Sequence, residues 1–113
     1  MTQRRLVIAI SNLSQNDNLR DELLQMKPVP FIISMAAKRD ENLRRGCASI
    51  FCNLSYKIGS EKSLVTAGIV PSLLVTAMIT SDQMQAKVIC VKALVNLMAD
   101  KSTFKLMAKE GNI

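Results

Sequence analysis

Three of the five Asn-Leu pairs in this chain recur at nearly constant spacing, and this repeat constrains the fold more than any other feature. The pairs are Asn12-Leu13, Asn53-Leu54 and Asn96-Leu97, so the asparagines are 41 and then 43 residues apart. The same offset aligns a downstream segment, because Lys27–Pro30 matches Gly68–Pro71. A fixed period of this length is typical of arrays in which each repeat is a small group of helices.

Each period contains one long segment with helical periodicity. Cys47, Ile50, Phe51 and Leu54 lie at i, i+3, i+4 and i+7, which places them on one face of a helix. The equivalent residues of the other two periods are also apolar, namely Leu6, Ala9, Ile10 and Leu13, and Cys90, Ala93, Leu94 and Leu97. We therefore expect long helices at 2–14, 42–55 and 83–98, each burying this face.

Two shorter helices should precede each long one, which is therefore called the third helix of its period. One runs from Ser60 to Ala67 and ends at Gly68, where glycine suits a left-handed C-cap. The next has Pro71 near its start and continues to about Thr80. Asp40 and Asp82 are the expected N-caps of the second and third long helices, at residues 42–55 and 83–98. Since no segment shows sustained strand alternation, the fold class is all-α.

A single three-helix period cannot bury its own apolar faces, so the periods should stack into one continuous core. We expect a right-handed α-solenoid in one domain, 1–113, with repeat pieces of about 1–38, 39–80 and 81–113, cut from a longer array. Uncapped ends would leave apolar side chains without a neighbour, which predicts self-association. The side chains expected at these ends are Leu6, Ile10, Leu106 and Met107.

The pattern resembles the armadillo repeat family, and the resemblance covers essentially the whole chain. It is carried by Ala67–Leu74, which contains a Gly-Ile-Val-Pro turn, and by the Ala-Leu-Val-Asn-Leu segment Ala93–Leu97. The first period departs from it, since Lys27-Pro28 replaces the glycine turn and predicts a distorted helix end there. The HEAT repeat is the structural alternative, with a helical period of similar length.

The resemblance implies that the third helices line a groove and that their asparagines hydrogen-bond the backbone of an extended peptide. These asparagines are Asn12, Asn53 and Asn96. A side-chain amide suits this role because it offers both donors and an acceptor. The alternative is that each asparagine bonds the backbone of the neighbouring repeat.

The positions four residues before the asparagines distinguish branches of the family. The importin-α branch usually carries tryptophan there, whereas this chain has Ile8, Ser49 and Lys92 and no tryptophan at all. The resemblance therefore argues against binding of nuclear-import cargo. A lysine at such a place looks more like the β-catenin branch, in which basic groove residues meet acidic ligands.

The formal charge of +6 belongs entirely to the predicted third helices. They contain six basic residues and no acidic ones, while the other nine basic and nine acidic residues balance. At 100° per residue, Arg4, Arg5, Arg45 and Lys92 point within about 80° of the asparagines, whereas Arg44 and Lys87 point away. The positive electrostatic potential of these basic side chains would attract an acidic protein segment. The candidate binding residues are Asn12, Asn53, Asn96, Arg5, Arg45, Ser49 and Lys92.

Composition disfavours the other functional classes. The chain has no histidine, phosphate-binding glycine loop or paired-carboxylate motif, so we expect neither an enzyme nor a metal or cofactor. Three cysteines in apolar patterns predict buried free thiols and an intracellular location, in the cytoplasm or nucleus. No apolar run is long enough to span a membrane. Structural assembly into a larger complex and nucleic-acid binding remain alternatives, the latter disfavoured because one Tyr and three Phe make a poor base-stacking surface.

Overall fold

The computed structural model describes residues 2–57, 59–79 and 84–110, and these residues form helices and no strand. The three predicted long helices are present with nearly the expected bounds, as α1, α4 and α7. The eight helices of the described ranges are α1 (Gln3–Ser14), α2 (Asp17–Gln25), α3 (Val29–Ala36), α4 (Glu41–Ser55), α5 (Glu61–Thr66), α6 (Ile69–Ile79), α7 (Met84–Leu97) and α8 (Lys101–Glu110).

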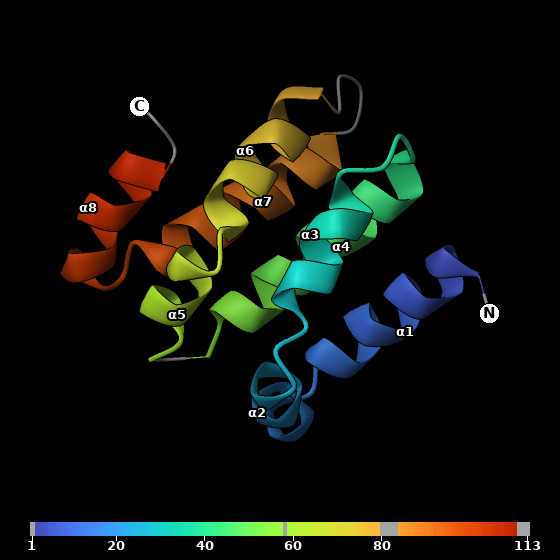
Figure 1. The fold of residues 1–113 in the computed structure, drawn as a ribbon, viewed down its shortest axis with the longest axis horizontal. Coiled ribbons are helices and arrows are strands. Elements are labelled where there is room, and N and C mark those ends of the chain that lie inside the picture. The colour runs from blue at the N-terminus through green and yellow to red at the C-terminus, as the bar shows by residue number, and fades with distance from the viewer. Residues whose placement is uncertain (1, 58, 80–83, 111–113) are drawn as a thin grey trace.

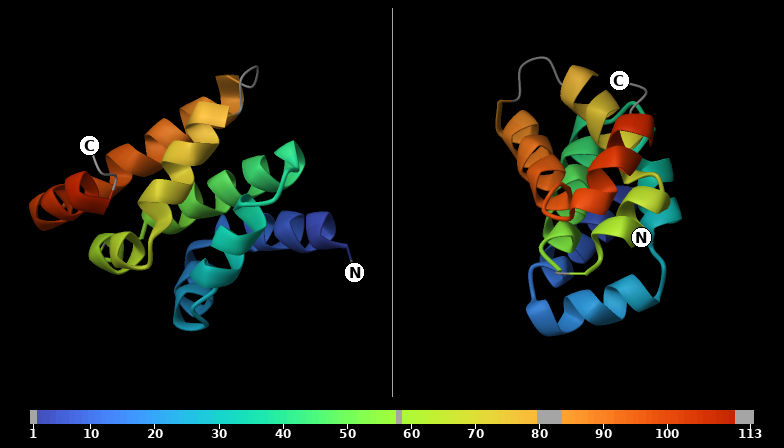
Figure 2. Two further views of the ribbon diagram at one scale, coloured as in Figure 1. Left: turned by 45° about the horizontal axis from the view of Figure 1, so that its top comes forward. Right: turned by 90° about the vertical axis from the view of Figure 1, so that its left-hand side faces the viewer.

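The long helices lie side by side, with α4 packed between α1 and α7 (Figure 1). A second layer is formed by α3 and α6, which pack on α4 and α7 respectively and also touch each other. The helices α2 and α5 connect a long helix to the next helix of the second layer, and α8 follows α7 and packs on α5 (Figure 2). The prediction that the long helices are neighbours is therefore confirmed. The groups α2–α3–α4 and α5–α6–α7 repeat the same order of one connecting, one second-layer and one long helix.

Capping and turn residues explain where the helices begin and end. The Asp40 side chain accepts hydrogen bonds from the backbone N–H groups of Asn42 and Leu43, at 2.9 and 3.2 Å, which confirms it as the N-cap of α4. Gly68 separates α5 from α6 with a φ of 97°, the left-handed conformation expected of it. Asp82, the other predicted cap, lies outside the described residues.

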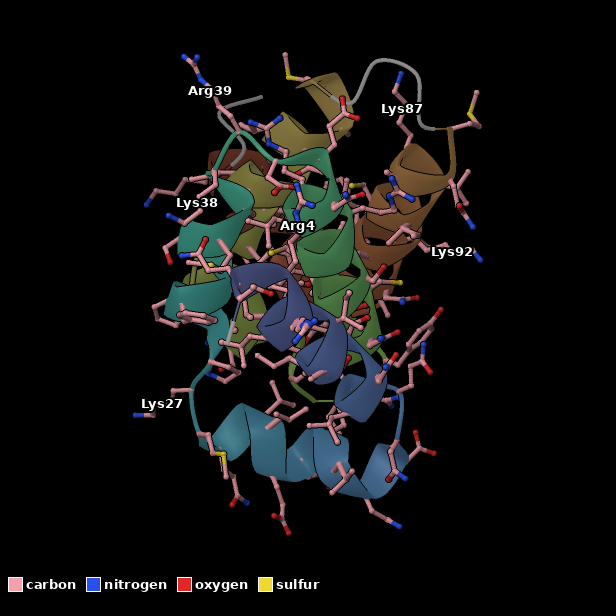
Figure 3. The ribbon with its side chains drawn as sticks, turned by 90° about the vertical axis from the view of Figure 1, so that its right-hand side faces the viewer. Arg4, Lys27, Lys38, Arg39, Lys87 and Lys92 are labelled. Atoms are coloured by element: carbon pink, nitrogen blue, oxygen red, sulfur yellow. The ribbon has the colours of Figure 1, made fainter. Side chains whose placement is uncertain are left out.

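The turn between α2 and α3 is not distorted by its lysine, contrary to the prediction from sequence. Lys27 has a φ of 53° and so adopts the left-handed conformation that its equivalent Gly68 adopts one period later. The turn keeps its shape and the backbone of Lys27 is strained, since a left-handed conformation costs a residue with a Cβ roughly 1–2 kcal/mol. The Lys27 side chain is exposed and points away from the helices (Figure 3).

Replacing Lys27 with glycine should therefore stabilise the protein by about 0.5–1 kcal/mol, because relief of the strained backbone exceeds the entropy that glycine adds to the unfolded chain. The free energy of unfolding in urea measures the effect. Lys27→Ala is the control, since it removes the charge but keeps the Cβ. An equal gain from alanine would show that the backbone conformation is not the cause.

The core is centred on α4, whose predicted apolar face is completely buried. Phe51, Ile50 and Leu54 are inaccessible to solvent, and so are Cys90 and Leu97 of α7. Cys47 and Cys90 are buried and unpaired, as expected from their place on the apolar face, and Cys52 is buried and unpaired as well. Burial raises the pKa of Cys47 to about 12 and that of Cys90 to about 11, so both thiols stay protonated at neutral pH.

The predicted apolar face of α1 is wrong in detail. Val7 and Ser14 are buried, whereas Ala9 is exposed and Leu13 is 46% exposed. The reason is that α4 has a long helix on each side, while α1 packs mainly on α2 and α4 in the described part of the chain. Equivalent positions therefore differ in burial even though their residue types agree.

Candidate functional site

The best candidate site is the face of α1, α4 and α7 that lies away from α3 and α6, here called the third-helix face. It consists of three rows of side chains, each with four-residue spacing along one helix. The rows are Arg4, Ile8 and Asn12 on α1, Arg45, Ser49 and Asn53 on α4, and Val88, Lys92 and Asn96 on α7. Lys92 extends from α7 on the side of the molecule opposite to Lys38, which follows α3 (Figure 3).

A depression of about 270 Å³ lies between α1 and α4 on this face. Its lining residues are Arg4, Ile8, Asn42, Arg45, Gly46 and Ser49. Gly46 permits the close approach of the two helices, because a Cβ at this position would overlap Cγ1 of Val7. The structure thus brings together Arg45 and Ser49, two of the predicted binding residues. Arg5 is exposed on α1 but does not line the depression.

The asparagines join neighbouring long helices, which is the alternative role considered for them. The Asn53 amide nitrogen donates to the Ser11 carbonyl at 3.3 Å and to the Ser14 hydroxyl at 2.9 Å. Both hydrogens of the Asn53 side-chain amide are therefore used within the fold, and only the side-chain oxygen Oδ1 remains to accept a hydrogen bond from a ligand.

The same contact recurs one period later, where the Asn96 amide nitrogen donates to the Ser55 hydroxyl at 3.0 Å. Ser14 and Ser55 in turn donate to the carbonyls of Ser11 and Cys52, so each serine links the asparagine to the preceding helix. Asn12, on the outer side of α1, is exposed. The asparagine row is thus a structural ladder between helices at Asn53 and Asn96.

The basic residues of the face differ in how far the fold already neutralises them. The Arg4 guanidinium donates to Asp40 at 2.8 Å, and this hydrogen bond lowers the pKa of the Asp40 carboxyl. In the described part of the chain, Arg5, Arg45 and Lys92 form no ion pair. The Arg45 Nη2 donates to the side-chain oxygen Oδ1 of Asn42 at 3.4 Å, and the enclosed Nε of Arg45 has no hydrogen-bond partner. These three side chains keep their charge available.

Two features of the site differ from the prediction or were missed by it. α4 begins at Glu41, so the long helices are not free of acidic residues as the predicted bounds suggested. Gly46 was not singled out, although a glycine inside a helical pattern signals close backbone approach. Ile8, which stands where the importin-α branch has a tryptophan, is 59% exposed and forms the apolar wall of the depression.

Within the described ranges, no helix is long and apolar enough to cross a membrane. No group of three or more His, Cys, Asp or Glu side chains among those residues is placed to hold a metal ion. Comparison of the chain with protein-family models, with curated proteins and with solved structures found no match.

Proposed function

We propose that this chain is an armadillo-type, right-handed α-solenoid that binds an extended, acidic segment of a partner protein on its third-helix face. The observation that carries the proposal is the depression between α1 and α4, where Arg45 and Ser49 meet the exposed apolar side chain of Ile8. Such a surface offers a charged contact, a hydrogen-bonding group and an apolar contact within one small area.

The armadillo assignment is supported by the order of the helices and by their turns. A three-helix period of about 42 residues, a row of long helices and a left-handed residue before the second-layer helix all agree with that repeat. The hydrogen bonds from Asn53 and Asn96 to the preceding long helix connect each repeat to the one before it.

The binding mode differs from the one that the family resemblance implies. Since the amide hydrogens of Asn53 are used in the fold, the asparagine row is a weak clamp for a peptide backbone. Arg5, Arg45 and Lys92 are free of ion pairs in the described structure and lie on three successive long helices. The partner is therefore recognised mainly through its negative charges, by side chains on α1, α4 and α7.

The distance between the long helices predicts how acidic residues should be spaced along the partner segment. Packed helices are about 8–10 Å apart. A chain extended in the polyproline II conformation advances about 3.1 Å per residue and presents every third side chain on the same side. A carboxylate at every third position would therefore meet one long helix after another. We expect a peptide with Asp or Glu at every third residue to bind more tightly than a peptide of the same composition with its acidic residues clustered.

Fluorescence anisotropy with these two labelled peptides tests the proposal at low and high salt. The combined change of Lys92→Glu with Arg45→Gln should weaken binding of the spaced peptide by about tenfold at low salt, chiefly through the association rate. The effect should shrink as salt screens the charges.

Lys38→Glu is the matched control, because Lys38 is exposed and lies on the second-layer side of the molecule (Figure 3). It should alter affinity by no more than about twofold. Equal losses from Lys38→Glu and Lys92→Glu would mean that net charge, and not the third-helix face, governs binding. Tighter binding of duplex or single-stranded DNA than of the spaced peptide would favour the nucleic-acid alternative.

A further inference from the structure

Four apolar side chains are exposed on α7 and α8 at the end of the helix row. Val91 is 57% and Phe104 54% exposed, and Val95 and Met98 are exposed as well. Val91, Val95 and Met98 lie on one face of α7 and its end, and Phe104 lies on α8, which follows it. We call these four residues the outgoing surface.

The residues equivalent to the outgoing surface are covered in both earlier periods. All of these equivalents are buried except Ser11, which is half-buried. They are Val7 and Ala48 for Val91, Ser11 and Cys52 for Val95, Ser14 and Ser55 for Met98, and Arg20 and Glu61 for Phe104. They are covered because α4 packs on α1 and α2, and α7 packs on α4 and α5. The position over α7 and α8 is therefore one that a long helix fills twice elsewhere in the same chain.

The opposite end of the row carries the matching surface. On α1, Leu13 and Ala9 are exposed, whereas their equivalents on α4 and α7 are buried against the preceding long helix. The equivalents of Leu13 are Leu54 and Leu97, and those of Ala9 are Ile50 and Ala93. Leu13 and Ala9, with Leu6 and Ile10 half-buried beside them, form the incoming surface. Leu106 and Met107, predicted to be exposed at this kind of end, are half-buried and buried respectively.

We propose that copies of this chain assemble head to tail, with the incoming surface of α1 in one copy packed on the outgoing surface of α7 and α8 in the next. The contact continues the packing that already joins α1 to α4 and α4 to α7. It buries apolar side chains whose equivalents are buried within each copy. The proposal does not rest on peptide binding by the third-helix face.

The contact between copies is weaker than the contacts within a copy, for two reasons. Val91 is equivalent to Val7, which meets Gly46, but the residue equivalent to Gly46 on the incoming helix is Arg5. A long side chain thus replaces a glycine at the closest approach of the helices. Each copy also carries a charge of +6, so copies repel each other at low salt.

Because the two surfaces differ, one contact leaves a free surface of each kind, and assembly continues without closure. Sedimentation velocity should show a weight-average mass that rises steadily with concentration. The mass should also rise with salt, which screens the repulsion. This salt dependence is opposite to the one expected for acidic-peptide binding, so each hypothesis can fail without the other.

Variants that block one surface each give the decisive test. Val91→Lys and Leu13→Lys place a positive charge on the outgoing and incoming surfaces respectively, at positions exposed enough to leave the fold intact. The lysine that replaces Val91 would face Arg5 of the next copy, so the two like charges repel. Each variant alone should be a monomer. An equimolar mixture should form a 1:1 heterodimer and nothing larger, because only one complementary pair of surfaces remains. A monomeric mixture, or self-association of Leu13→Lys alone, would overturn the head-to-tail geometry.

Arg5→Ala tests the fit at Val91 from the opposite direction. It shortens the side chain that replaces Gly46 and removes a positive charge, so association should strengthen by about tenfold. Arg39→Ala, at an exposed position after α3 (Figure 3), removes the same charge and should have a small effect. Equal gains from both variants would assign the effect to net charge. A wild-type protein that remains monomeric at high concentration and high salt would overturn the proposal altogether.

Discussion

Replacing Leu54 with alanine is expected to lower the free energy of unfolding by about 2–5 kcal/mol, whereas the same replacement at Leu13 should cost less than about 1 kcal/mol. The two leucines occupy the same position of the repeat and follow an asparagine in both cases. Leu54 is inaccessible to solvent between α1 and α7, so truncation leaves a cavity. Leu13 is 46% exposed and loses only part of its contacts.

Leu97 completes the series, because it occupies the same position on α7 and is fully buried. Leu97→Ala should behave like Leu54→Ala. Urea unfolding with an unchanged denaturant slope measures all three costs on one scale. The measurements belong at low protein concentration, since assembly would cover Leu13 and raise its apparent cost. A cost at Leu13 as large as that at Leu54 in the monomer would contradict the exposure of the α1 face.

Replacing Gly46 with valine is expected to destabilise the protein by about 2 kcal/mol or more, even though valine has the higher helix propensity. Any Cβ at this position overlaps Cγ1 of Val7, and Val7 itself is only 1% exposed. The substitution must push α1 away from α4, which also stretches the hydrogen bonds from Asn53 to Ser11 and Ser14.

The same reasoning predicts a rescue. Val7→Ala alone should lower the free energy of unfolding by about 2 kcal/mol, because it leaves a cavity. The double variant Val7→Ala with Gly46→Val should lose less stability than the two single variants added together. We expect a coupling of about 1–2 kcal/mol, within the range seen for residues in contact. Val65→Ala is the control, since Val65 is as buried as Val7 but no atom of it lies within 4 Å of a Cβ built at Gly46, so its cost should add to that of Gly46→Val. Additive costs for Gly46→Val and Val7→Ala would show that the helices do not meet at this pair.

The two proposed binding surfaces differ in chemistry and lie on different parts of the molecule. The third-helix face carries unpaired basic side chains and a depression between α1 and α4, whereas the ends of the helix row carry apolar side chains. The first suits an acidic protein segment and the second a copy of the same chain. Their opposite responses to salt allow the two kinds of association to be measured separately in one preparation.

The sequence by itself determined the helices and their order. Apolar spacing located α1, α4 and α7, Asp40 marked the start of α4, and Gly68 marked the turn before α6. These features depend on residues close together in the chain, because helix periodicity, caps and turns are local properties of the backbone. The constant period then showed that the long helices should be neighbours, since each unit needs another to bury its apolar face.

Only the tertiary structure decided how equivalent residues differ from one another. Leu13 and Leu54 are identical in sequence pattern, but their burial depends on whether a long helix lies on each side. The amide hydrogens of Asn53 are bound by residues 39 and 42 positions earlier, and Arg4 is paired with Asp40, 36 positions later. Such partners are set by the packing of one helix on another, which repeat spacing does not specify at the level of single atoms.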